Sequence, residues 1–135
     1  MSQKPRIQTR FEEFINSLTH GLGGLLAIPA VLYLIYFSIQ NGDYYRTISF
    51  IIYGISLLLI LFLSAMYHGV EKSPLKKFLN KLDHAGIFIF IAGTYTPFLL
   101  VTLRDGYGIP MLFLIWSIAV LGVFSEIYWF KIFIF

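Results

Sequence analysis

Cysteine is absent from this chain of 135 residues, and charged residues make up only 13% of it. The first absence excludes disulfides and thiolate metal sites, so a zinc ion would need histidine, carboxylate or water as ligands. The second contrasts with the roughly 25% of charged residues in soluble domains. Hydrophobic residues account for 58% of the chain, and its mean hydropathy is +0.77. A soluble chain of this length cannot bury so much apolar surface, so we expect an integral membrane protein.

Long apolar runs dominate the sequence. A helix needs about 20 apolar residues to cross the hydrocarbon core of a bilayer. Four segments meet this requirement, at about 17–39, 46–68, 84–103 and 109–130. We therefore predict an all-α fold, a polytopic transmembrane helix bundle, with residues 1–135 forming a single transmembrane domain.

Basic residues are unevenly distributed between the segments that separate these runs. The N-terminal tail and the 69–83 loop hold seven of them: Lys4, Arg6, Arg10, Lys72, Lys76, Lys77 and Lys81. The other two loops hold only Arg46 and Arg104. Because basic loops remain in the cytoplasm, we expect a multi-pass protein of the plasma membrane with a cytoplasmic N-terminus. Charges placed in this way reflect topology, so we expect no nucleic-acid partner.

With this topology, the three histidines of the chain, His20, His68 and His84, lie near one leaflet. Ser64 lies one turn before His68 on the same helix face, and Asp83 opens the third span. Polar groups at the edge of a span are costly and are candidates for function. Imidazole and carboxylate suit zinc, a carboxylate can orient or deprotonate its water, and a serine can bind a substrate.

A purely structural interpretation exists for several of these residues. His20 could bond a neighbouring backbone group, and His84, next to a loop, could be solvated. Glu126 could reach the interface or pair with Lys131. For Ser64, His68 and Asp83 we favour a functional interpretation, because three polar residues converge where apolar ones would be less costly.

The segment SAMYH at 64–68, followed by Asp83 in the run DHAGIFIFIAGTYTPF, resembles the hemolysin III family. That family is grouped with the progestin and adipoQ receptors and is related to the alkaline ceramidases. The segment EEFINSLTHGLGG near the N-terminus is similar to the family's opening motif, through Glu13, Asn16, His20 and Gly21. The resemblance extends from residue 12 to about residue 124.

The resemblance implies a bundle of seven helices with a zinc ion near the cytoplasmic side. It implies that His68 is a zinc ligand, that Asp83 contacts the zinc-bound water, and that Ser64 lines the same site. The family's other two ligands come from an H-x-x-x-H motif in the last span, which this sequence does not contain after His84. We therefore expect the chain to correspond to the N-terminal part of a family member. His20, His84, Glu126 or a second chain would have to complete the site.

Three functions follow as hypotheses. The first is a zinc-dependent hydrolase in the manner of a ceramidase, acting on an amide of a lipid-like substrate. The second, which the bacterial family name implies, is a pore-forming cytolysin. Four spans with few polar residues would need a homo-oligomer to line such a pore. The third is a non-catalytic membrane regulator.

Overall fold

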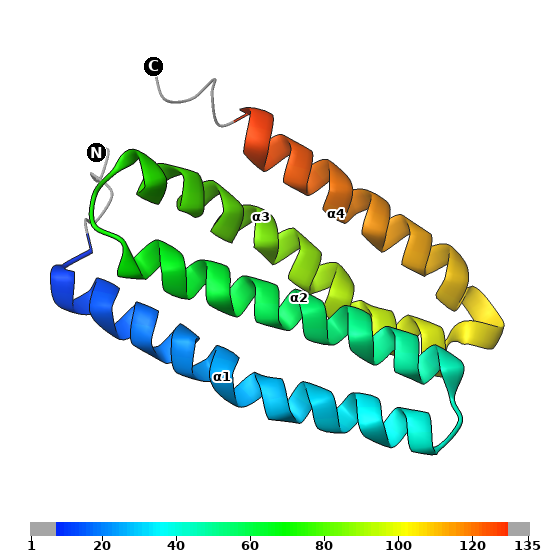
Figure 1. Cartoon of the computed structure of the whole chain (residues 1–135). Coiled ribbons are helices and arrows are strands. Elements are labelled where there is room, and N and C mark those ends of the chain that lie inside the picture. Colours follow the sequence, from blue (N-terminus) through cyan, green and yellow to red (C-terminus); the bar gives the residue numbers. More distant parts are fainter. Residues whose placement is uncertain (1–7, 130–135) are drawn as a thin grey trace.

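A computed structural model describes residues 8–129 and shows four long antiparallel helices (Figure 1). Their bounds are Arg10–Gln40 for α1, Tyr44–Gly69 for α2, Pro74–Pro97 for α3 and Ile109–Trp129 for α4. Two short segments, η1 at Phe98–Thr102 and η2 at Arg104–Gly108, connect α3 to α4; η1 is a π-helical turn, and η2 is kinked at Gly106, whose backbone is not helical. No strand occurs in this part of the chain.

The helices form a row in chain order. Helix α1 packs on α2, α2 on α3, and α3 on α4, while within residues 8–129 the backbone of α1 does not come close to that of α3 or α4. Figure 1 shows the two ends of this described segment at the same end of the row. All four helices are long and apolar enough to cross a membrane. The prediction of an all-α transmembrane helix bundle is confirmed.

The first helix extends beyond its apolar run, because a polar residue caps it well before that run begins. Thr9 caps α1 through a reciprocal pair of bonds, in which its Oγ1 accepts from the Glu12 amide at 3.2 Å and its own amide donates to Glu12 Oε2 at 2.8 Å. As a result, α1 begins well before the expected start of the first span at residue 17. His20 therefore lies about three turns into the helix.

Small residues lie at the contacts between helices, as expected for association in lipid. Gly23 of α1 faces Leu61 of α2. On α3, Gly86 faces Ile60 and Gly93 faces Ser56, and a Cβ atom at residue 93 would overlap that serine. These contacts fix the registers of α1 and α3 against the central α2.

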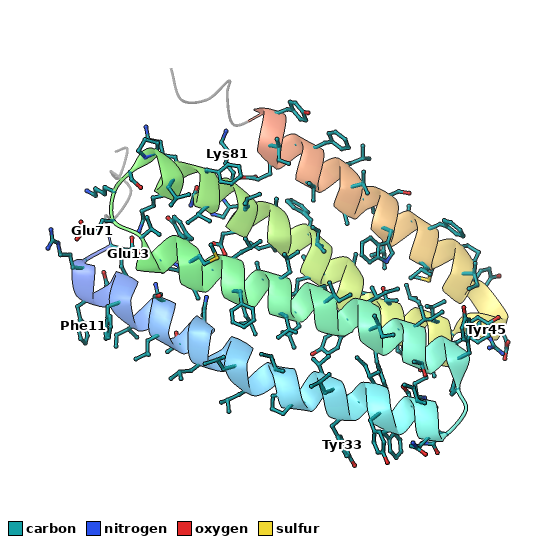
Figure 2. All side chains as sticks on the ribbon, viewed as in Figure 1. Phe11, Glu13, Tyr33, Tyr45, Glu71 and Lys81 are labelled. Carbon is teal, nitrogen blue, oxygen red and sulfur yellow. The ribbon has the colours of Figure 1, made fainter. Side chains whose placement is uncertain are left out.

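The opposite end of the row is held by polar and aromatic contacts. Helix α3 ends at Pro97, which has no amide hydrogen, and the chain continues in the π-helical turn η1. Trp116 Nε1 of α4 donates to Thr96 Oγ1 of α3 at 3.1 Å. The guanidinium of Arg104 lies 4.2 Å from the ring centroid of Tyr45, which Figure 2 labels at this end.

Candidate functional site

The packing of α1 on α2 brings His20 and Ser64 into contact. His20 Nδ1 lies 2.5 Å from Ser64 Oγ, and the serine is buried. The two helices approach closely there, because Gly21 faces Ala65. One turn away, Ser17 Oγ donates to the carbonyl of Ala65 at 2.8 Å. The glycine contact and these two hydrogen bonds fix the register that pairs His20 with Ser64.

The same register brings Glu13 of α1 to His68 of α2. Glu13 Oε2 lies 2.8 Å from His68 Nδ1 and 3.0 Å from Lys76 Nζ of α3. Lys76 Nζ also donates to the Val70 carbonyl at 3.1 Å and lies 4.9 Å from the ring centroid of Tyr67. The side chains of His68, Lys76 and Glu13 are only 10%, 16% and 22% exposed. One largely buried carboxylate thus links three helices.

The two imidazoles lie next to each other, with ring centroids 6.0 Å apart and planes at 82°. An ionised carboxylate only accepts hydrogen bonds, so His68 Nδ1 carries the proton that bonds Glu13. In a neutral ring, Nε2 then keeps its lone pair. Within residues 8–129 the Nε2 atoms of His20 and His68 make no hydrogen bond. We call Glu13, His20, Ser64, His68 and Lys76 the polar cluster.

Asp83 is not part of the polar cluster. It is half-buried in α3 and makes no hydrogen bond or ion pair to any residue between 8 and 129. Its neighbour His84 bonds Glu126 of α4, with Nδ1 and Oε1 3.1 Å apart. His84 and Glu126 therefore interact with each other, although the sequence suggested separate structural interpretations for them. Lys131, the other partner considered for Glu126, lies outside the described residues.

Glu13 and Lys76 were not predicted from the sequence as members of the site. In the sequence, Glu13 stands out only as part of a motif similar to that of the family, and Lys76 only as one of the basic residues that indicate topology. A usable signal was present, because Glu13 lies two turns before His20 on the same face of α1. In an antiparallel helix pair that joins His20 to Ser64, this face continues toward His68. The contact could be anticipated only once the helix pairing was known.

The imidazole and carboxylate groups of the polar cluster supply only some of the ligands that a zinc ion requires. Catalytic zinc sites use three protein ligands and keep one position open. Between residues 8 and 129, no group of three or more histidine, aspartate, glutamate or cysteine residues is arranged to hold a metal ion. The adjacent rings of His20 and His68 supply two imidazoles. These residues fit part of a zinc site and do not form a complete one.

A cavity of about 620 Å³ lies beside the polar cluster and reaches it. Glu13, His68 and Lys76 form part of its wall, together with residues from the start of α1 and the α2–α3 loop. Figure 2 labels Glu13 and Glu71 close together at this end of the row. Glu13, His68 and Lys76 are therefore accessible from the end of the row where α1 begins.

We expect Glu13 and Lys76 to be energetically coupled. A double-mutant cycle with Glu13→Gln and Lys76→Met should give a coupling free energy of about 1–2 kcal/mol, above that of exposed pairs, because both side chains are mostly buried. Unfolding in mixed detergent would be followed by circular dichroism. Glu12→Gln with Lys76→Met is the control cycle, because the Glu12 carboxylate bonds Thr9. A coupling no larger than in the control would contradict the arrangement.

Comparison with known proteins places the chain among its relatives. The model of the family described as "Haemolysin-III related" matches residues 8–133. Hemolysin-3 of Bacillus cereus is 38% identical over 136 residues, which cover 99% of this chain and 62% of that protein. The hemolysin-3 homolog of Bacillus subtilis strain 168 is 42% identical over 123 residues, covering 91% of this chain and 58% of that protein. No solved structure matches.

The chain thus spans less than two thirds of the length of either relative. The family match, in contrast, covers nearly all of the chain and includes every residue of the polar cluster. It agrees with the resemblance noted for the segments around Ser64, His68 and Asp83. The chain is a membrane protein of the haemolysin III family.

Proposed function

We propose that the polar cluster is this chain's contribution to a zinc-dependent, hydrolase-like site at the cytoplasmic side of the plasma membrane. The observation that carries the proposal is the bond between Glu13 Oε2 and His68 Nδ1. A carboxylate on the outer nitrogen of a ligating histidine fixes its tautomer and makes the other nitrogen a better ligand. Zinc, when bound, supplies Lewis acidity and activates water for attack on a carbonyl group.

The proposal assigns a role to each residue. His68 is a ligand through Nε2, oriented by Glu13, which Lys76 holds in place. Ser64 bonds His20, which lies next to His68, and lines the site. Asp83, whose carboxylate has no ion pair within residues 8–129, is the group that would orient the attacking water or accept its proton. The proposed substrate is lipid-like, with an amide bond.

The remaining ligands have two proposed sources. One is a segment corresponding to the part of the longer relatives that this chain does not match. The other is a second copy of this chain in a homo-oligomer. Either source would have to approach the His20 and His68 rings, since residues 8–129 provide no third ligand there.

Pore formation, the second function that we considered for this chain, has less support. A water-filled pore needs polar side chains that face the lumen. The hydroxyls of Ser56, Thr94 and Thr96 instead donate to carbonyls of their own helices, at 2.8, 2.7 and 2.8 Å. The hydroxyl hydrogens of these mid-helix residues are thus already used.

The proposed orientation places the start of α1 and the α2–α3 loop in the cytoplasm. Five of the seven basic residues counted for these segments lie within the described range, namely Arg10, Lys72, Lys76, Lys77 and Lys81. The loops at the other end hold Arg46 and Arg104. This asymmetry supports the orientation through the positive-inside tendency.

Zinc content tests the proposed site. In chain purified from membranes with detergent, we expect near-stoichiometric zinc, which His68→Ala removes and the control His84→Ala keeps. Glu13→Gln should weaken zinc binding by about 10–100-fold, as other losses of a carboxylate behind a metal-binding histidine do. Zinc per chain is measured by mass spectrometry of the metal. A His68→Ala chain that keeps its zinc would contradict the proposal, and a wild-type chain without zinc would contradict a second copy of the chain as the source of the remaining ligands.

Cysteine labelling tests the orientation, and the chain contains no cysteine that would interfere. In intact cells, a membrane-impermeant maleimide should label Asn41→Cys, in the α1–α2 turn. It should label Lys77→Cys, near the start of α3, only after the cells are permeabilised, because the proposed orientation puts that residue inside. The reverse pattern would show that the N-terminus is not cytoplasmic.

A further inference from the structure

The cavity beside the polar cluster has a distinct set of charged walls. Three cations line it, from three separate segments: Arg10 at the start of α1, Lys72 in the α2–α3 loop, and Lys76 in α3. Two carboxylates, Glu13 and Glu71, also line it. The cations therefore outnumber the carboxylates, and they surround a concave space rather than a flat surface.

Some of these charged side chains already form ion pairs, and others do not. Lys76 and Glu13 form an ion pair at 3.0 Å, and Glu13 also binds His68. Arg10 and Lys72 are exposed and make no ion pair with any residue in the range 8–129. Two cations from different segments of the cavity wall are thus available to an anion that enters it.

Apolar side chains lie directly next to this cationic cavity. Phe14 lines the cavity and is 60% exposed. Phe11, which Figure 2 shows on the outer side of α1, is 72% exposed. At the border of a transmembrane helix, such side chains lie against acyl chains. A ligand that contacts both features would carry an anionic group joined to a hydrocarbon tail.

We infer that this cavity binds the phosphate-bearing headgroup of an anionic phospholipid, with Arg10 and Lys72 contacting the phosphate and Phe11 and Phe14 contacting the acyl chains. Basic pockets at the ends of transmembrane helices are suited to such headgroups. Arginine offers planar, paired donors to phosphate oxygens, and lysine adds a point charge. The inference is independent of zinc and of hydrolysis.

Native mass spectrometry of the full chain in mild detergent tests the site. The protein is mixed with equal amounts of phosphatidylglycerol and phosphatidylcholine, in the presence of a chelator so that zinc plays no part. The wild-type chain should retain phosphatidylglycerol over phosphatidylcholine by roughly tenfold or more, and Arg10→Gln with Lys72→Gln should remove most of that preference. Circular dichroism would confirm that the variant keeps its helices.

The matched control is Lys77→Gln with Lys81→Gln, which removes the same charge from the neighbouring part of α3 without touching the cavity wall. This variant should keep the preference for phosphatidylglycerol. Equal loss in both double variants would overturn the inference, because it would show attraction to general basic charge. Full retention in the Arg10 and Lys72 variant would overturn it as well.

A second experiment distinguishes a bound phospholipid from bound free phosphate, because the two share the phosphate group that the cavity would recognise. Inorganic phosphate and glycerol phosphate are added at millimolar concentration to the protein with phosphatidylglycerol bound. Because neither compound has acyl chains to place against Phe11 and Phe14, we expect the lipid to remain bound. Complete displacement by inorganic phosphate would show a site for the free anion and would overturn the lipid assignment.

Discussion

The close packing of α1 on α2 is the constraint on which the rest of this structure depends. Gly21 has no side chain where it meets Ala65, and the Ser17 hydroxyl bonds the Ala65 carbonyl across the interface. In lipid, the hydrophobic effect does not drive two helices together, so close contact of small residues and interhelical hydrogen bonds decide the register. A shift of one turn would separate His20 from Ser64 and Glu13 from His68.

Burial of charge explains why the polar cluster takes this form. An unpaired carboxylate at the edge of a membrane span is costly, and such groups pair with one another or with backbone carbonyls. Glu13 meets this requirement through His68 and Lys76, and Lys76 meets it further through the Val70 carbonyl. The same residues that stabilise the end of the bundle therefore orient the His68 imidazole, and its Nε2 atom makes no hydrogen bond within residues 8–129. Structure and proposed chemistry share one set of contacts.

The helices could be predicted from the sequence, but the site could be predicted only in part. Apolar runs predicted the four helices because the bilayer imposes a length and a composition on each. Ser64 and His68 could be singled out because their spacing puts them on one face. Glu13 could not, since its role depends on a partner 55 residues away in sequence. The pairing of His84 with Glu126 depends in the same way on how α4 lies against α3.

The most direct test of the account is a disulfide between α1 and α2 in native membranes. A Cβ atom at residue 21 would lie 3.8 Å from that of Ala65, within the range that a disulfide requires. Since the chain has no cysteine of its own, Gly21→Cys with Ala65→Cys gives a clean readout by loss of maleimide–polyethylene glycol labelling after mild oxidation. We expect rapid bridging of this pair and little bridging of Gly21→Cys with Leu61→Cys, one turn away. Preferential bridging between positions 21 and 61 would mean that His20 does not meet Ser64, and would contradict the central claim.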